Sequence, residues 1–412
     1  MIIRPRRGNI PSVNIRKQKG VALILAIMIV ALVTAISVDI TWRFELTLAR
    51  SANRWHGMQA RAYIDGAEQL AKFALRADAE MDNSEDGTLA DYFDEDWNQE
   101  QMFSTDEGGW ISGNVDDALS LFNINSLMEQ LPDPENKILG ICDKYAPAHR
   151  RFIRLLRTVN LATGTISGAE RDWLFRSEPR DKKIREPGDD GDDDEGSTSY
   201  YNANDEEYMT LDDAEALTEA VIDWLDADDD PTGFNGAEGE YYDRLDPPLT
   251  IANGPMASVS ELQVIKGMIP EVYNALVDYI IALPPEPAGE LGLNLNTLTY
   301  PVMRTIAPGP TCLEPMTIED TDVLVDAVRR NAFIDMTEFK DDLDVKGLMA
   351  FSGTAPLEGE GEGDFKFRSN YFLLYSEAMV GEHLRKGSSL LFRQEDGDTY
   401  RVDTLRRTDA HF

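Results

Sequence analysis

The chain has 412 residues and a formal net charge of −36. This length allows two or three domains. The strong negative charge argues against nucleic-acid binding, because phosphates would be repelled. The two cysteines, Cys142 and Cys312, lack the four-ligand spacing of a zinc site. Whether they form a disulfide stays open, because a sequence cannot show whether their Cα atoms approach each other.

The N-terminal region joins a basic leader to an apolar segment. Residues 1–20 hold six basic residues and no acidic one, and Val21–Val38 carries no charge before Asp39. This segment has about the minimum length for crossing a ~30 Å hydrocarbon core at ~1.5 Å per residue, and basic residues favour the cytoplasmic side. The alternative, a buried core helix, rarely lacks a polar face. We therefore expect a transmembrane helix over residues 21–41, with the body across the membrane.

The expected cleavage site lies before the apolar segment. A secretory signal peptide is cut after its apolar part and loses it. Here the basic leader ends at Gly20, directly before Val21. Cleavage between these two residues would leave the apolar helix as the N-terminus of the mature protein.

The helix is expected to continue beyond the membrane. No proline occurs between Val21 and Ala79, so a single helix would be ~85 Å long; a broken pair of helices is the alternative. Apolar residues beyond Asp39 recur at intervals of three and four, which predicts one stripe that packs on a globular body. The stripe comprises Trp55, Met58, Ala62, Gly66, Leu70 and Phe73.

The remainder of the chain divides by its periodicity. Residues 80–130 are loop-rich with one strand-like piece, Leu121–Asn125, and the acidic residues 186–207 predict a disordered loop. The last part of the chain predicts a small antiparallel sheet, with a turn at Asp396-Gly397. Its strands are predicted at 365–368, 371–374, 390–392 and 400–405, and helices at 128–131, 146–160, 211–225, 270–283, 300–306 and 317–331.

The strongest chemical signal is an acidic loop after one predicted helix. Five carboxylates fall within the eight residues Asp223–Asp230, and a Gly-rich turn and Glu238 follow. Ca²⁺ takes about six to eight oxygen ligands of this kind. The loop is not an EF-hand, because counting from Asp226 puts Pro231 where that motif needs Gly. Calcium binding and a solvated acidic loop both stay open.

The sequence shows no catalytic pattern. The four histidines are scattered, and neither a Gly-rich phosphate loop nor a nucleophile elbow occurs. The segment Val264–Ile269 resembles a helix-hairpin-helix turn, but the acidity of the chain favours a packing hairpin. We expect a protein without enzymatic activity.

Two sets of residues resemble known proteins. The junction Lys19-Gly20-Val21-Ala22-Leu23-Ile24-Leu25 resembles the processing site of type IV pilins and pseudopilins. Downstream segments are similar to the K-type minor pseudopilin of type II secretion systems, with gaps, as far as Arg407. These segments are Asp223–Asp228, Gly236–Glu238, Tyr241-Tyr242, Ser260–Leu262 and Leu293–Thr297.

The resemblance implies a fold and an order of domains. The expected fold is α+β, with a pilin-like long N-terminal helix, a small antiparallel sheet and a large inserted all-α domain. The expected parts are a cleaved leader at 1–20, a transmembrane helix at 21–41, the helix spine and first part of the body at 42–130, the inserted domain at 131–340 and the completing strands at 341–412.

The resemblance also implies chemistry and partners. Prepilin peptidase would cut between Gly20 and Val21, and the new N-terminus would be methylated. Other minor pseudopilins, of the I and J types, and the major pseudopilin would be partners. A structural Ca²⁺ would bind Asp226, Asp228 and Glu238, with Asn253 and Glu261 as further ligands. Asp223 is expected instead to cap or pair within its helix.

One position favours the tip of a filament. Leu25 stands at the fifth mature position, where most pilins carry Glu. A carboxylate there is costly in lipid unless a neighbour's N-terminal amine pairs with it, so a subunit without a neighbour above needs none. We expect an inner-membrane protein with a periplasmic body that caps the type II secretion pseudopilus. A minor pilin of a type IV pilus, acting in initiation or adhesion, and a membrane-anchored calcium-dependent enzyme are the alternatives.

Overall fold

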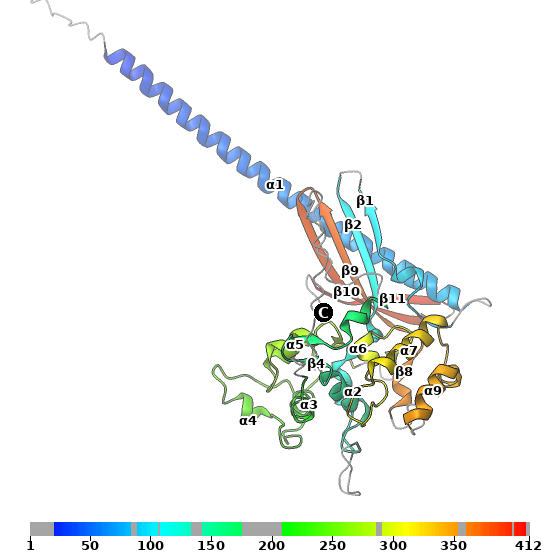
Figure 1. Cartoon of the computed structure of the whole chain (residues 1–412). Coiled ribbons are helices and arrows are strands. Elements are labelled where there is room, and N and C mark those ends of the chain that lie inside the picture. The colour runs from blue at the N-terminus through cyan, green and yellow to red at the C-terminus, as the bar shows by residue number, and fades with distance from the viewer. Residues whose placement is uncertain are drawn as a thin grey trace, which may run out of the picture.

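One long helix and a mixed body form the molecule (Figure 1). The computed structural model describes residues 20–83, 89–105, 108–132, 142–174, 208–285, 291–352, 360–397 and 399–408. Helix α1 (Val21–Asp82) is continuous over 62 residues, or ~93 Å, so the prediction of a single helix is confirmed. The predictions for leader residues 1–19 and for the acidic loop 186–207 lie outside the described residues.

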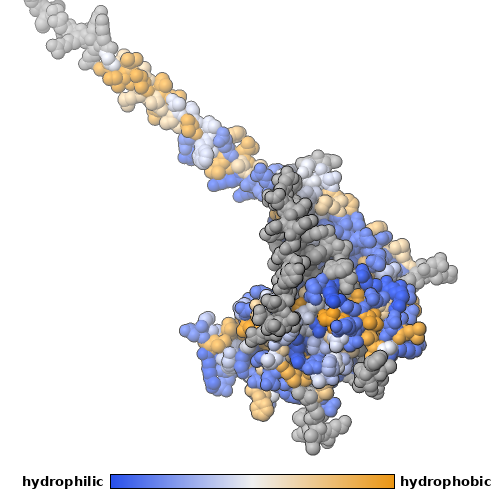
Figure 2. Space-filling view, viewed as in Figure 1, coloured by the Kyte–Doolittle hydropathy of each residue, from blue (hydrophilic) through white to orange (hydrophobic). Residues whose placement is uncertain are grey.

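The first half of α1 stands clear of the body. Every side chain from Val21 to Arg50 is exposed. An 18-residue window of the helix has a mean hydropathy of 3.0 and is 0% buried, so α1 is long and apolar enough to cross a membrane. Figure 2 shows the apolar residues gathered toward the free end of the helix. This region has the properties of a membrane anchor.

A five-stranded antiparallel sheet forms the pilin-like body, in the order β1-β2-β9-β10-β11. Two distant segments meet in its middle, where Asp117 on one strand lies opposite Phe372 on another. The predicted turn at Asp396-Gly397 is confirmed, and Gly397 adopts a φ of 67° that favours glycine. The strands are β1 (Gln101–Ser104), β2 (Trp110–Asp117), β9 (Tyr371–Val380), β10 (His383–Asp396) and β11 (Thr399–Thr408).

The second half of α1 packs across this sheet through a face different from the one expected. Its buried residues are Ala60, Ile64, Glu68, Ala71, Leu75, Asp78, Ala79 and Asp82. The predicted stripe points away, because Trp55, Met58, Leu70 and Phe73 keep 48–64% of their surface exposed. The prediction that this stripe packs on the body is therefore wrong. Alanines and acidic residues interrupt the buried face, so it forms a weaker hydrophobic pattern in the sequence than the large side chains of the exposed stripe.

The segment between β2 and β9 forms a mainly helical domain below the sheet (Figure 1). Its helices are α2 (Pro147–Leu156), α3 (Leu211–Leu225), α4 (Gly239–Tyr242), α5 (Pro270–Leu276), α6 (Tyr300–Met303), α7 (Ile318–Arg330), α8 (Met336–Asp341) and α9 (Leu343–Ser352). Three strand pairs accompany them: β3 (Phe122–Asn123) with β6 (Ile280–Ile281), β4 (Val159–Asn160) with β5 (Thr165–Ile166), and β7 (Leu293–Asn294) with β8 (Phe365–Lys366). The described 3-10 turns are Asp96–Asn98, Ala118–Ser120, Ile124–Met128, Ala169–Leu174, Val259–Val264 and Glu362–Asp364.

An apolar core and a disulfide hold the helical domain together. The core draws on most of its helices, and Phe152, Val221 and Tyr300 lie in it with no exposed surface. Cys142 and Cys312 form a disulfide with their Cα atoms 5.8 Å apart. The sequence left open whether the two cysteines pair. The structure shows that they do, and the disulfide links segments 170 positions apart.

The α+β class is confirmed, but several elements differ from prediction. The helix at 211–225 is confirmed with both its bounds. The helix after Pro270 ends at Leu276, and Ile280 begins β6 instead. The strand-like piece near 121–125 is short and lies outside the main sheet.

Two further differences concern residues 80–131. The sequence predicts a loop where β1 and β2 form a hairpin, because this segment is acidic and rich in glycine and shows little alternation. The predicted helix at 128–131 is absent, since the local 3-10 turn ends at Met128.

Candidate metal centre

The acidic loop that contains Asp226, Asp228 and Glu238 follows directly after helix α3. Asp226 caps the C-terminus of α3, and Asp223 lies one turn earlier with no exposed surface. The carboxylate of Asp223 accepts hydrogen bonds from the backbone N–H groups of Thr232 and Ala237. Asp223 therefore fastens the returning loop to the helix, a role across the loop rather than the cap or pair within the helix that the sequence suggested.

The loop is packed so closely that one position requires glycine. A Cβ atom on Gly236 would lie 2.3 Å from Oδ2 of Asp223 and 2.6 Å from the backbone nitrogen of Thr232. Contacts this short are not tolerated, and two of these partners are fixed by the hydrogen bonds just described. The loop thus has a defined shape.

Three of the predicted ligands come together in this loop. One carboxylate oxygen from each of Asp226, Asp228 and Glu238 lies within 4.8 Å of the other two. Glu238 is 6% exposed, and neither of its carboxylate oxygens has a hydrogen-bond partner; the same is true of Oδ1 of Asp226. These are buried anionic oxygens without compensation in the described part of the chain.

The electrostatics of the cluster agree with this geometry. Burial and the neighbouring charges of Asp228 and Asp223 raise the pKa of Asp226 to about 7. Burial and the charges of Asp223, Asp226 and Asp228 raise the pKa of Glu238 to about 7. Positive charge supplied at this point would relieve both effects.

Asn253 lies beside the three carboxylates. Its backbone φ is 43°, and its side-chain amide donates a hydrogen bond of 3.3 Å to the backbone oxygen of Asp228. Its own Oδ1 is buried and has no hydrogen-bond partner in the described chain. The strained backbone thus presents another unsatisfied oxygen near the cluster.

Glu261, the fifth predicted ligand, is placed elsewhere by the structure. Its Oε1 accepts hydrogen bonds from the backbone of Ala257 and Ser258, as part of a capping box. Its Oε2 accepts from the indole of Trp224 at 3.3 Å. The structure therefore gives Glu261 a capping role and does not bring it into the carboxylate cluster.

Glu219 supports the loop and was missed by sequence reasoning. It is 1% exposed, pairs with Lys144 at 2.8 Å and accepts a hydrogen bond from the backbone of Asn235. It lies four residues before Asp223 on α3, so it shares a helix face with that loop-holding carboxylate. That spacing is the signal from which its role could have been found.

The unsatisfied oxygens fit a hard cation. A buried acceptor without a partner costs about 1–3 kcal/mol, and here several converge from Asp226, Glu238 and Asn253. Ca²⁺ binds oxygen ligands of these types in flexible arrangements. Asp226, Asp228 and Glu238 would hold the ion, with Asn253 beside them, and the ion would cross-link the end of α3 to the start of α4.

The expected processing site lies at the start of α1. Gly20 is the N-cap residue, exposed, and the helix begins at Val21. Cleavage there stays a prediction.

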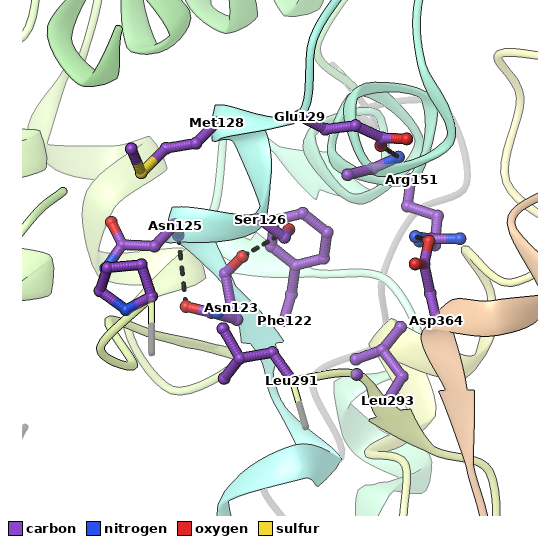
Figure 3. Close-up of a pocket in the computed structure, with 13 residues that line it drawn as sticks. Phe122, Asn123, Asn125, Ser126, Met128, Glu129, Arg151, Leu291, Leu293 and Asp364 are labelled. Atoms are coloured by element: carbon purple, nitrogen blue, oxygen red, sulfur yellow. Dashed lines mark hydrogen bonds and ion pairs between the residues drawn. The ribbon is translucent and has the colours of Figure 1, made fainter. Parts of the chain in front are cut away.

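A cavity of about 400 Å³ lies in the helical domain (Figure 3). Arg151 and Asp364 face each other at one side as an ion pair, and Asn123 and Asn125 lie at the other. Glu129 accepts a hydrogen bond from the first turn of α2, through the backbone of Ala148. These polar groups are engaged in structural contacts, and their arrangement gives no specific pointer to catalysis.

The fold defines a pilin-like α+β protein whose sheet carries an inserted helical domain with a candidate metal loop. A family model for "Type II secretion system (T2SS), protein K" matches residues 207–285, the stretch from α3 to β6 that contains the loop. The resemblance to the K-type minor pseudopilins of type II secretion systems that the sequence indicated is thus confirmed.

Known proteins are similar to this chain, in sequence or in fold, over most of its length. Type II secretion system protein K of Pseudomonas aeruginosa is 26% identical over 93% of this chain and 91% of its own length. The protein of the same name from Pectobacterium carotovorum is 29% identical over 69% of this chain and 67% of its own. The fold matches a chain from the crystal structure of the GspK-GspI-GspJ complex of enterotoxigenic Escherichia coli. That match has a TM-score of 0.51 and 19% identity, over 87% of this chain and 98% of that one.

Proposed function

We propose that the protein caps the tip of the type II secretion pseudopilus and acts in assembly for protein export, without enzymatic activity. Helix α1 would anchor it in the inner membrane after prepilin peptidase cleaves behind Gly20, and the body would lie in the periplasm. The observation that carries this proposal is the exposed apolar face of α1, which continues from the membrane segment along the body.

The exposed stripe supports binding to other subunits. Trp55, Met58, Leu70 and Phe73 keep about half or more of their surface in solvent, on the side of α1 opposite its sheet contacts. An apolar groove of about 240 Å³ adjoins them, and Leu70 and Phe103 are among its lining residues. Contiguous apolar surface of this kind marks an interaction site. The solved relative occurs in a complex with GspI and GspJ, and we infer that the I-type and J-type minor pseudopilins, followed by the major pseudopilin, are the partners here.

Two features support a position at the tip. The first turn of α1 contains no acidic residue, so no carboxylate is present to bind the N-terminal amine of a subunit above. The helical domain also makes the body much broader than helix and sheet alone at the end away from the membrane anchor (Figure 1). A subunit of this shape would obstruct stacking above it.

Calcium would serve this function structurally. The proposed ion at Asp226, Asp228 and Glu238 lies in the helical domain, far along the chain from α1. It would hold the loop between α3 and α4 in shape and would take no part in chemistry. Its removal should therefore weaken the domain before it affects the membrane anchor.

The proposal is tested by placing a charge on the stripe. Leu70→Glu should abolish co-purification with the I-type and J-type partners from the same operon and reduce export of the secreted proteins. Leu343→Glu is the matched control, because Leu343 is 83% exposed on the helical domain and receives the same change. If Leu70→Glu still formed the complex, or if both variants lost co-purification equally, the stripe would no longer support binding to other subunits.

Mass spectrometry of the protein from a host with prepilin peptidase tests the processing step. The mature chain should begin at a methylated Val21. A chain that still carries residues 1–20, or that begins downstream of α1, would contradict the proposal.

A further inference from the structure

A second group of carboxylates lies in the pilin-like body, where α1 ends. Asp78 and Asp82 are one helical turn apart on α1, and Glu95 follows in the segment before β1. One carboxylate oxygen from each lies within 4.8 Å of the other two. We propose that Asp78, Asp82 and Glu95, here termed the body cluster, form a second site for a hard divalent cation such as Ca²⁺. It is independent of the proposed function and of the candidate metal centre at Asp226, Asp228 and Glu238, here termed the loop site.

The body cluster is buried more completely than the loop site. Asp78, Asp82 and Glu95 are 9%, 8% and 7% exposed. Oδ2 of Asp82 is buried and has no hydrogen-bond partner in the described chain. An uncompensated anionic oxygen inside a protein is strongly unfavourable. The unpartnered carboxylate, directed into a group of other carboxylates, is the feature that points to a bound cation.

The arginine within the cluster is already engaged. Arg393, on β10, donates to Asp78 at 3.1 Å and to both carboxylate oxygens of Asp91 at 2.6 Å. Asp91 has no exposed surface, and its carboxylate also accepts from the backbone of Ser369. Arg393 thus mainly satisfies Asp91, and its hydrogen bond to the body cluster goes to Asp78.

The other neighbours do not balance the charge. Arg368 attracts Asp82 through space, but its guanidinium donates to the backbone oxygen of Ala79 at 3.4 Å. Glu95 accepts from neutral donors, the indole of Trp97 and a backbone N–H. Four carboxylates, counting Asp91, therefore face two guanidinium groups. The excess of two negative charges equals the charge of one divalent cation.

The electrostatic shifts point the same way. Burial and the charges of Asp78 and Asp91 raise the pKa of Glu95 to about 9. Burial and Asp82 raise the pKa of Asp78 to about 7, although Arg393 lowers it, and burial and Asp91 raise that of Asp82 to about 6. Without a cation, the carboxyl groups of the cluster would have to bind protons. Protonation is therefore the alternative to cation binding.

A cation here would connect three parts of the body. The three carboxylates would supply oxygen ligands, and water would complete the coordination. The ion would tie the last turn of α1 to the segment that leads into β1. Through Arg393, which contacts both Asp78 and the backbone of Leu75, it would also be coupled to β10.

Terbium luminescence distinguishes the two sites in the full-length chain in detergent, because Tb³⁺ replaces Ca²⁺ and is sensitised by a nearby indole. Trp97 donates a hydrogen bond to Glu95 of the body cluster, and Trp224 lies in the last turn of α3 between Asp223 and Asp226. Calcium stoichiometry, measured by equilibrium dialysis, should be two for the wild type. It should be one for Asp82→Asn/Glu95→Gln, one for Asp226→Asn/Asp228→Asn, and zero for the four changes combined.

Controls separate loss of a site from loss of the fold. Asp82→Asn alone removes an unpartnered charge, so its thermal midpoint in chelator should not fall, while calcium affinity at one site should drop at least tenfold. Trp97→Phe should remove one terbium signal and leave the calcium count at two. Two calcium ions still bound by Asp82→Asn/Glu95→Gln would overturn the proposal. A wild-type count of one, lost on changing the acidic loop, would also overturn it and would favour protons in the body cluster.

Discussion

The pilin-like body and the helical domain are stabilised in different ways. In the body, α1 meets the sheet through small, larger apolar and acidic side chains, and ion pairs lie at this contact, such as the buried Glu68 with the half-exposed Arg407. In the helical domain, short helices share one apolar core and are cross-linked by a disulfide and, as we propose, by calcium. Short helices have little stability of their own, so cross-links matter most there, whereas ion pairs fix how α1 lies on the sheet.

The largest expected effect is on the helical domain and follows from the disulfide. The double variant Cys142→Ala/Cys312→Ala should lose up to about 5 kcal/mol of unfolding free energy in the chain-entropy model, because the closed loop is long. Urea unfolding of the full-length protein in detergent measures this loss. Reductant should lower the wild type to the level of the variant and leave the variant unchanged. A variant as stable as the oxidised wild type would show that the core alone suffices.

The second effect tests calcium in the same domain. Asp226→Ala/Asp228→Ala should lower the thermal midpoint in calcium but hardly change it in chelator. Calcium at 100 times its dissociation constant would stabilise the wild type by about 2.7 kcal/mol. Equal losses with and without calcium would show that the two carboxylates stabilise the loop without a metal.

The third effect concerns the body and depends on pH. Burial alone would raise the pKa of Glu68, but hydrogen bonds from Arg407, Thr404, Lys72 and Ser389 lower it to about 2. A carboxyl group whose pKa is lower in the folded state stabilises the fold above its unfolded pKa, and this contribution disappears as pH falls through the folded value. Glu68→Gln should therefore cost about 2 kcal/mol at neutral pH.

The cost should shrink as the pH falls from about 4.5 toward 2, as measured by urea unfolding at several pH values. Glu240→Gln is the control, because Glu240 forms an exposed pair with Arg244 and should cost less than about 0.5 kcal/mol. A penalty for Glu68→Gln that stayed constant across this range would assign its effect to packing instead of charge.

The smallest effect on stability is expected on the exposed face of α1. Leu70→Glu should change the unfolding free energy by less than about 0.5 kcal/mol, since surface substitutions rarely do more. Its effect should appear in assembly alone. A large loss of stability would mean that the stripe contacts the body, as the sequence first suggested.

Local patterns were predictable from the sequence, and contacts between distant segments were not. The helix at 211–225 and the grouping of Asp226, Asp228 and Glu238 depend on neighbouring residues, and the structure contains both. Glu261 shares the acidic character of this region but caps its own 3-10 turn. Its position three residues after Ser258 matches the capping-box pattern, and this is the signal from which its capping role could have been predicted.

The face of α1 that meets the sheet could not be inferred from hydrophobicity. Its residues include Ala60, Ala71 and the charged Glu68, whereas Trp55 and Phe73 gave the stronger pattern on the opposite side. The partner of Glu68, Arg407, lies at the far end of the chain. The body cluster was missed for a similar reason, because Glu95 lies outside α1 and is brought to Asp78 and Asp82 only by the fold.

The helical domain is joined to the sheet where β2 pairs with β9, and Ile281 and Leu283 of the domain also pack against the sheet. Asp117 and Phe372 face each other across these strands, so the chain leaves the sheet and returns to it at neighbouring positions. The domain is therefore inserted without a change in the order of the strands. An insertion at this position leaves α1 and the five-stranded sheet as one continuous unit, so the inserted domain adds bulk to the body without interrupting either element.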